Sequence, residues 1–578
     1  MRTTSTLAAL LTLITFGCEG RYRLGHAFDS AQAGEAGAPD SGGANSGAAG
    51  GGGDQGGMPE PGEAGAPLGG SVNGGSVNGG SVNGGDGGAL SDAGAAGGGP
   101  DPDPLGRVRW LAVETFPSSA SSQTLLGLVD LQKPTWQGVV VESTSVESML
   151  PSPDQRWVLY SSFRKSETLG DIRDFYLVNT AKKNPGQRQL LLADQPRTAS
   201  CVWSPDSSRL ACDKGPDSES DLRQLVLFNL TATSFGPAID VAEISCAPSF
   251  FGANALAYCD ALGELQRLDL ADDAPSTTTD LGVQSTWLSP ASDGRRTLSF
   301  TNEPDGELLL DVMTGDKQPV EHGISLDESM NAGVLSQLNL TDNVVSASYS
   351  YYAVNGVDIT RAGQSDVSFD FKPTTLVQRS GRAVAHMSGD RVAAVYVPAS
   401  GEATARVVPG DYATVQDFVL DPTGQRLYIQ AAQFEGGRPI PSTVEHWLSQ
   451  LTPEGPEPAK LLAQGFAADG QFSNDGQRLL LSGDTLYDAP AHDAELRLYD
   501  LADPAQPHER LLSLGVVWAE PTFSSDSTYL AMITYSLTRS VRELWVVDLL
   551  APDVAPRAVY SCSSNPAPLP GCPNFVVF

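Results

Sequence analysis

Cysteine is the residue type in this chain whose spacing most clearly predicts chemistry. Cys18 stands alone near the N-terminus, and the other six of the seven cysteines form three close pairs: Cys201/Cys212, Cys246/Cys259 and Cys562/Cys572. The first two pairs each flank a predicted turn symmetrically, so the two strands of a hairpin would bring their side chains face to face. We predict three disulfides, which persist in an oxidising compartment, with buried free thiols as the alternative. There is no CxxC motif, which argues against a zinc site or a thioredoxin-type redox centre.

The remaining motifs of catalysis and metal binding are missing from the sequence. The six histidines are scattered, without an HxH or HExxH pair, and we expect them at the surface: His26, His322, His386, His446, His492 and His508. We find no GxSxG nucleophile elbow, no P-loop, no dinucleotide fingerprint and no calcium loop of the DxDxDG type. The segment Ser152–Trp157 is similar to a sialidase box but lacks its glycine and spacing, so we interpret it as a turn. We therefore predict no catalytic, cofactor-binding or metal-binding residues.

The first residues have the pattern of an export signal. Arg2 supplies a positive charge, and the apolar run Leu7–Phe16 is too short to span a bilayer. The run leads into Thr15-Phe16-Gly17-Cys18, which resembles a bacterial lipobox with Thr15 in place of the usual leucine. We predict a lipoprotein signal peptide over residues 1–17 and lipidation of Cys18, with an ordinary secretory signal as the alternative. Glu19 after the cysteine, by resemblance to Gram-negative sorting rules, favours the outer membrane, with the protein facing the periplasm or the cell surface.

The composition changes completely between Cys18 and the folded part of the chain. From residue 29 to residue 105 the segment is rich in glycine, alanine and serine, has no lysine, arginine or aromatic residue, and contains the tandem repeat GGSVNGGSVNGGSVNGG. Such a chain cannot bury enough apolar surface to offset its ordering entropy. We predict a disordered linker over residues 18–105 that tethers a folded domain to the membrane.

A motif repeated along residues 106–578 predicts the fold. A tight turn of the Ser-Pro-Asp type lies between two short apolar strands, and a third strand follows that ends in Asp or Asn at intervals of about 40–50 residues. The third-strand endings are Asp130, Asn179, Asn229, Asp269, Asp311, Asp500 and Asp548, with a weaker one at Leu451. We predict an all-β protein, a β-propeller of about eight four-stranded blades within a range of seven to ten. Two smaller rings are the alternative.

These turns and strands resemble the TolB-like or PD40-type, WD40-related repeats of bacterial envelope proteins. The resemblance extends over residues 107–578 and implies a propeller, in a family whose TolB members are envelope scaffolds. The family's Ser-Pro-Asp-Gly turn has Gln155 and Ser207 in place of glycine in the first two copies. Residues 314–410 have no clear turn motif, so they hold either one degraded blade with an insertion or two divergent blades.

The two ends of the repeat region predict how the ring closes. The segment Arg107–Phe116 aligns with a second strand whose first strand is missing, and the chain ends in the apolar strand Asn574–Phe578. We predict that this C-terminal strand completes the first blade and that the loop between Cys562 and Cys572 braces the closure.

Charge and composition limit the classes of partner. The formal net charge is −33 and the pI about 4.4, so the phosphate backbone of nucleic acid would be repelled. We expect a monomeric, non-enzymatic, membrane-anchored scaffold that binds an envelope protein or a glycan and needs no cofactor. The alternative is a propeller lyase or hydrolase that acts on polysaccharide, for which three or more histidines or carboxylates should converge at one mouth of the ring; a purely structural module is a third possibility.

Overall fold

The computed structural model describes residues 110–577 with gaps, of which the longest are 116–123, 181–187, 216–221, 370–376, 484–495 and 564–572. The chain divides into two units, residues 1–91 and 92–578, and all described residues lie in the second. The predicted signal peptide, Cys18 and the whole of the predicted linker therefore lie outside the described residues, as does the whole of the first unit.

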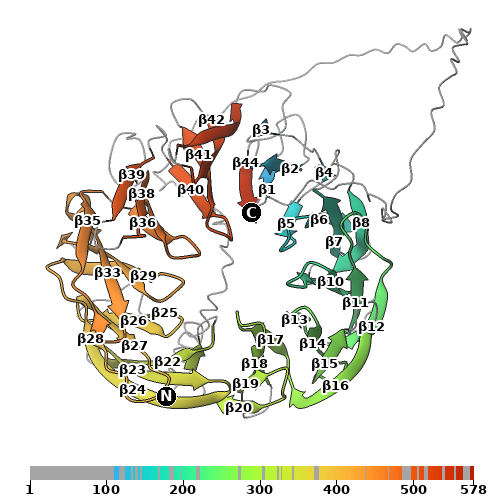
Figure 1. Ribbon diagram of the computed structural model, residues 1–578, viewed down its shortest axis with the longest axis horizontal. Helices are drawn as coiled ribbons and strands as arrows, with labels where there is room; N and C mark the ends of the chain where they lie inside the picture. The colour runs from blue at the N-terminus through green and yellow to red at the C-terminus, as the bar shows by residue number, and fades with distance from the viewer. Residues whose placement is uncertain are drawn as a thin grey trace, which may run out of the picture. The chain divides into compact units, whose positions relative to one another are not determined.

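The described part of the chain is almost entirely β-structure, as predicted. It forms ten antiparallel sheets of four or five strands, which we number as blades 1–10, plus one small hairpin. In Figure 1 the blades of this unit follow one another around a ring, with the first strand of each blade on the inner side.

The first five blades contain the strands up to residue 320 and, in blade 1, the C-terminal strand. Blade 1 is β44 (Pro573–Val577), β1 (Trp110–Thr115), β2 (Thr124–Asp130), β3 (Thr135–Trp136) and β4 (Val141–Ser143). Blade 2 is β5 (Val146–Pro151), β6 (Trp157–Ser166), β7 (Gly170–Asn179) and β8 (Gln189–Pro196). Blade 3 is β9 (Cys201–Trp203), β10 (Arg209–Lys214), β11 (Arg223–Asn229) and β12 (Ile239–Ile244). Blade 4 is β13 (Ser249–Phe251), β14 (Ala255–Cys259), β15 (Glu264–Leu270) and β16 (Pro275–Gln284). Blade 5 is β17 (Trp287–Pro290), β18 (Arg296–Phe300), β19 (Glu307–Asp311) and β20 (Lys317–Val320).

The second five blades contain the rest. Blade 6 is β21 (Ile324–Leu326), β22 (Ala332–Thr341), β23 (Val344–Asn355) and β24 (Asp358–Phe369). Blade 7 is β25 (Val377–Ser380), β26 (Ala383–Ser388), β27 (Arg391–Tyr396) and β28 (Arg406–Val407). Blade 8 is β29 (Thr414–Leu420), β30 (Arg426–Ala432), β33 (Glu445–Thr452), β34 (Gly455–Pro456) and β35 (Lys460–Gln464), with an inserted hairpin, β31 (Phe434–Glu435) and β32 (Arg438–Pro439), and a 3₁₀ turn, η1 (Pro441–Thr443). Blade 9 is β36 (Ala468–Phe472), β37 (Arg478–Gly483), β38 (Leu496–Asp500) and β39 (His508–Leu511). Blade 10 is β40 (Trp518–Phe523), β41 (Tyr529–Ser536), β42 (Val541–Asp548) and β43 (Arg557–Ser563).

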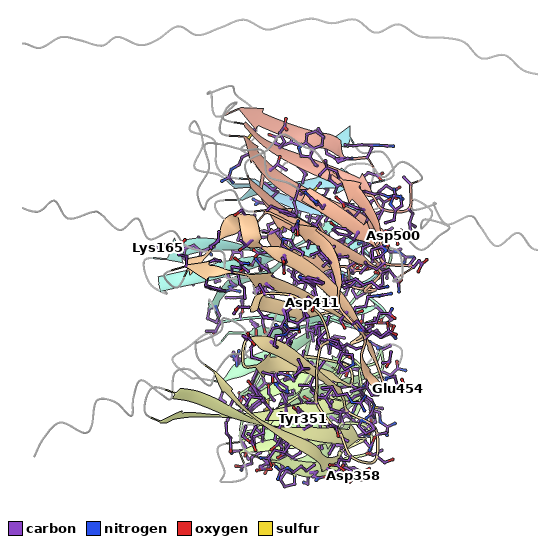
Figure 2. The ribbon with its side chains drawn as sticks, turned by 90° about the vertical axis from the view of Figure 1, so that its left-hand side faces the viewer. Lys165, Tyr351, Asp358, Asp411, Glu454 and Asp500 are labelled. Atoms are coloured by element: carbon purple, nitrogen blue, oxygen red, sulfur yellow. A yellow bond between two sulfur atoms is a disulfide. The ribbon has the colours of Figure 1, made fainter. Side chains whose placement is uncertain are left out.

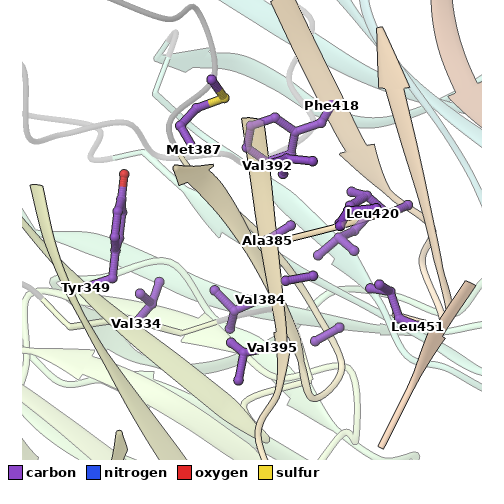
Figure 3. Packing of buried hydrophobic residues seen from close by; sticks show 14 of the residues in the cluster. Val334, Tyr349, Val384, Ala385, Met387, Val392, Val395, Phe418, Leu420 and Leu451 are labelled. Atoms are coloured by element: carbon purple, nitrogen blue, oxygen red, sulfur yellow. The ribbon is translucent and has the colours of Figure 1, made fainter. Parts of the chain in front are cut away.

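A buried apolar cluster lies at every junction between neighbouring blades. Eight clusters each join two consecutive blades, and a ninth extends across blades 6, 7 and 8. Figure 3 shows the ninth, in which Tyr349 of blade 6, Val384 of blade 7 and Phe418 of blade 8 are buried together. Strands buried on both faces need continuous apolar runs, which explains the weak polar alternation in the sequence. Because these clusters include the junction of blade 10 with blade 1, the blades form one ring, and the alternative of two smaller rings is wrong.

The C-terminal strand closes the ring as predicted. β44 pairs with β1 antiparallel, from Ala112 opposite Val577 to Thr115 opposite Pro573. Val576 is buried beside Leu111 of blade 1 and Ile533 of blade 10. The last strand of the chain therefore completes the blade that begins at Trp110.

The number of blades is ten, the upper end of the predicted range rather than the expected eight. Residues 314–410 contain the end of blade 5 and two complete blades, 6 and 7, which is the two-blade alternative. In blade 7 the turn between the first two strands is shortened to Gly381 and Arg382, and Gly381 has φ of 56°. A turn this short has no place for the Ser-Pro-Asp motif, so the motif undercounts the blades.

Where the motif is present, its hydrogen bonds repeat from blade to blade. In six blades the first residue of the turn donates its N–H to the carbonyl five residues later, and the fourth residue donates its N–H back to the first. The fourth residue has positive φ in all six: Gln155, Ser207, Gly294, Gly424, Gly476 and Ser527. The three non-glycine residues therefore adopt the same left-handed conformation as the glycines, at a cost of roughly 1 kcal/mol each.

The predicted third-strand endings lie where the motif places them, at the ends of third strands. The carboxylate of Asp311 accepts the N–H of Met313, that of Asp500 accepts the N–H of Ala502, and that of Asp548 accepts the N–H of Leu550. An acceptor is needed here because the chain reverses into the fourth strand and leaves backbone N–H groups without ladder partners. This local bond explains why Asp recurs at the end of the third strand.

Candidate functional site

The ring has two faces, which differ in the connections they carry. The turn face holds the turns between first and second strands and between third and fourth strands; the loop face holds the connections between second and third strands and from each blade to the next. In Figure 2, Asp358, Glu454 and Asp500 lie on the turn face, and Lys165 lies on the opposite, loop face.

On the turn face, the carboxylates of the repeated turns are engaged within their own turns. Asp154 accepts the hydroxyl of Ser152 and the N–H of Arg156, and Asp526 likewise accepts the hydroxyl of Ser524 and the N–H of Thr528. These carboxylates stabilise the chain reversal, so the repeated acid is explained by local structure rather than by a ligand.

Four arginines on the turn face link each of their blades to the next. Each is the first residue of a second strand, and each guanidinium donates to backbone carbonyls of the following blade: Arg209, Arg296, Arg426 and Arg478. Arg426 is buried and donates to the carbonyls of Gly476 at 2.6 Å and Leu501 at 3.1 Å. We call these four residues the bridging arginines.

Two serines make a second set of links between neighbouring turns. Ser207 and Ser527 stand at the left-handed position that glycine occupies in other blades. The hydroxyl of Ser207 accepts the N–H of Asp154 in the preceding blade at 2.8 Å, and that of Ser527 accepts the N–H of Asp475 at 3.0 Å. The serines therefore replace the conformational freedom of glycine with a hydrogen bond between blades, which strengthens the turn face further.

Two of the three predicted disulfides lie on the loop face, in blades 3 and 4. Cys201 bonds Cys212, which is its register partner on the next strand, and Cys246 bonds Cys259. The first joins the first two strands of blade 3, as predicted, and the second joins the segment before β13 to the last residue of β14 in blade 4. Cys562 is buried and disulfide-bonded, and Cys572 lies outside the described residues, so the pairing of those two stays a prediction.

A buried acid follows the first disulfide directly. Asp213 accepts the N–H of Ser200 and a bond of 2.5 Å from Arg223, whose other terminal nitrogen donates to the carbonyl of Ser245. Burial raises the pKa of Asp213 to about 6, against the opposing effects of the Ser200 N–H and the Arg223 charge. Its acceptor sites are engaged by blade 3 itself, which indicates a structural role at the start of the connection to blade 4.

Blade 5 carries an aromatic pair on the loop face close to the second disulfide. Trp287 and Phe300 are cross-strand partners whose rings stack at 4.8 Å with an interplanar angle of 28°. Trp287 is 45% exposed, whereas Phe300 is partly buried and packs against the cluster between blades 5 and 6. Leu262, 76% exposed, lies at the turn after Cys259 in blade 4. These three residues form the most exposed apolar group on the described loop face of blades 4 and 5, and we call them the aromatic patch.

Two histidines lie in the core, which corrects our expectation that the histidines are surface residues. His386 is fully buried and its Nε2 lies 2.6 Å from the hydroxyl of Tyr351, while the Nδ1 of the buried His446 lies 2.7 Å from the hydroxyl of Tyr428. Burial lowers the pKa of His386 to about 4 and lowers that of His446. His508 is exposed.

The other histidines, His26, His322 and His492, lie outside the described residues. Within the described ranges, no three His, Cys, Asp or Glu side chains lie close enough to hold a metal ion. Within the same ranges, the search for a long apolar helix able to cross a membrane finds none.

Comparisons with known proteins return structural likeness without a family. No protein-family model matches the chain, and no curated protein sequence matches it. Among solved structures, a eukaryotic initiation factor is similar at 13% identity and a TM-score of 0.41, over 81% of this chain and 95% of that one. The dihydro-heme d1 dehydrogenase NirN is similar at 15% identity and a TM-score of 0.34, over 72% of this chain and 74% of that one. The β-propeller domain of Cps50 (Swd1) from Myceliophteria thermophila is similar at 15% identity and a TM-score of 0.24, over 56% of this chain and 88% of that one. The ten sheets of the described residues establish the β-propeller without the comparisons.

The bridging arginines and Trp287 were not anticipated from the sequence. The bridging arginines had a sequence signal, because an arginine recurs five residues after the start of the turn. Trp287 had a weaker one, because it stands four residues before the turn of blade 5, where blades 2 and 8 have the polar residues Ser148 and Asp417.

Proposed function

We propose that this protein is a lipid-anchored scaffold of the bacterial envelope whose propeller binds a protein or glycan partner on its loop face. The observation that carries the proposal is the contrast between the two faces. On the turn face, the bridging arginines and turn carboxylates are bonded within and between blades, and the exposed apolar side chains Leu150, Met313 and Leu550 lie in three separate blades. On the loop face, the exposed Trp287 and Leu262 lie on two segments that a backbone hydrogen bond joins. An exposed apolar group on a rigid support is typical of a recognition surface.

The proposed role is non-catalytic and needs no cofactor. The closed ring supplies rigidity, because every junction is filled by an apolar cluster, and the loop-face connections of blades 3 and 4 are fastened by disulfides. Rigid presentation lowers the ordering cost of binding. The repeated turns support a TolB-like or PD40-type origin for the ring, which is part of this proposal.

The lipid anchor is tested by substitution of the predicted acylation site. Cys18→Ser removes the thiol that would carry the lipid. We expect the wild-type protein in the outer-membrane fraction and the variant in the soluble exported fraction, because one exposed domain without acyl chains has little affinity for a bilayer. Recovery of the variant in the outer membrane would contradict the anchor while leaving partner binding open.

Partner binding is tested by co-purification from detergent-solubilised envelopes with the full mature chain as bait. Leu262→Glu places a charge on the loop face, and Leu550→Glu, at another exposed leucine, places the same charge on the turn face. We expect one abundant partner with wild type and Leu550→Glu, and at least a tenfold loss with Leu262→Glu. A partner that depends on Leu550 instead, or the absence of any partner, would overturn the proposal.

A further inference from the structure

We propose that the aromatic patch is a stacking site for an uncharged pyranoside, with Trp287 as the platform. This deepens the proposed function, because it names the chemical class of partner at the loop face and rests on that function.

Among the described residues, the ring that stacks on Trp287 is that of Phe300, on one side of the indole. Phe300 stacks against it at 4.8 Å, yet Trp287 remains 45% exposed. Since one ring face packs on Phe300, the exposed area belongs to the opposite face and the ring edge. The exposed face of an indole is electron-rich and attracts the weakly positive C–H groups of a second flat surface.

The backbone on both sides of the ring is fixed. The buried hydroxyl of Ser285 donates to the carbonyl of Trp287 at 3.0 Å, and the N–H of Thr286 donates to the carbonyl of Phe300 at 2.7 Å. Phe300 is in turn packed against the cluster between blades 5 and 6. The platform is therefore in place before a ligand arrives, which reduces the entropy lost on binding.

Leu262 lies on a turn whose backbone is bonded to the segment that holds the platform. The N–H of Ser285 donates to the carbonyl of Gly263 at 2.7 Å, which joins the turn of blade 4 to the strand that starts at Trp287. The disulfide Cys246–Cys259 fastens the base of that turn. The patch thus offers an exposed aromatic ring and, on the neighbouring turn, an exposed aliphatic side chain.

Charge and area favour a sugar over the other classes of partner. The chain carries a formal net charge of −33, which repels phosphorylated or sulfated polymers. The carboxylate of Asp260, in the same turn as Leu262, is engaged by the N–H groups of Leu262 and Glu264 and by the amide of Gln266. Three side chains supply a few hundred Å² at most, below the roughly 800 Å² per partner of a stable protein interface. A gluco-configured pyranose presents a flat C–H face of the size of one indole, with its hydroxyls at the rim.

The test is titration calorimetry of the full mature chain with chitohexaose, and with cellohexaose as a second probe. We compare wild type with Trp287→Ala, Trp287→Leu and Trp287→Phe, and use Phe434→Ala as the matched control, because Phe434 is an exposed aromatic of the loop face in blade 8. Melting temperatures establish that each variant is folded.

We expect wild type to bind at least one probe, Trp287→Ala and Trp287→Leu to lose at least tenfold in affinity, Trp287→Phe to lose about threefold, and Phe434→Ala to lose less than twofold. A sugar needs the aromatic face, whereas apolar protein docking accepts leucine. Equal binding by wild type and Trp287→Leu would overturn the inference. If neither probe binds while an envelope protein is still captured through Leu262, the inference fails and the proposed function stands; if nothing is captured either, both fail.

Discussion

Deletion of residues 573–578 removes the strand that closes the ring. β44 supplies the first strand of blade 1 and contacts both blade 1 and blade 10. Without it, β1 has an unpaired edge, and the cluster around Leu111 and Val113 is open to water. The deletion therefore affects the junction at which the first and last blades meet.

The expected loss of stability follows from the contacts of the strand. Four residue pairs join β44 to β1, and backbone hydrogen bonds contribute about 1 kcal/mol each to net stability. Burial of Val576 contributes roughly 1.5–3 kcal/mol more. The free energy of unfolding should fall by about 6 kcal/mol, a large part of the total of about 5–15 kcal/mol typical of a folded domain.

Urea unfolding followed by circular dichroism measures the effect. We expect the truncated chain to unfold at a markedly lower urea concentration, Val576→Ala to lose about 2 kcal/mol, and Val407→Ala, at an exposed valine of β28, to lose less than about 0.5 kcal/mol. If the truncated chain unfolded at the same urea concentration as the full chain, closure by β44 would be refuted.

Three further predictions concern the interior of the ring. Arg426→Ala leaves buried carbonyls of the next blade and the carboxylate of Asp421 without their guanidinium. The free energy of unfolding in urea should fall by about 3–5 kcal/mol, against less than about 0.5 kcal/mol for the exposed Arg156→Ala. Equal losses would contradict the bridging role. Lowering the pH from 6.5 to 4 should destabilise the fold by up to about 3 kcal/mol through His386. The pKa of His386 is about 4 in the folded state, so only the unfolded chain takes up the proton in this window. His386→Gln should remove that part of the pH dependence, and an unchanged slope of unfolding free energy against pH would refute it. The double variant Cys201→Ser, Cys212→Ser should lower the free energy of unfolding by about 3 kcal/mol under oxidising conditions. No difference from wild type in oxidising buffer would contradict a stabilising disulfide.

The repeated turn and the third-strand ending were readable from the sequence because each depends on local hydrogen bonds. A carboxylate that caps its own turn, as in Asp154 or Asp548, is determined by residues within a short segment. The same holds for the disulfides of blades 3 and 4, whose cysteines lie 11 and 13 residues apart on either side of a turn. Closure by the last strand was also predictable, because a blade without a first strand and a strand without a blade are complementary.

Features that depend on the neighbouring blade were not readable in this way. Blade 7 turns through Gly381 and Arg382, so its identity rests on apolar strands that any core would accept. The burial of His386 depends on Tyr351, which reaches it from blade 6, 35 residues away. Trp287 became a candidate only when its stacking on Phe300 and its open face were visible together.

The most direct test of partner binding at the loop face is site-specific photo-crosslinking in intact cells. A photo-reactive amino acid replaces Leu262 on the loop face in one strain and Leu550 on the turn face in the other, both at exposed positions. The proposed function predicts a discrete covalent adduct after irradiation from position 262 and none from position 550. An adduct from position 550 alone, or none from either position, would contradict it.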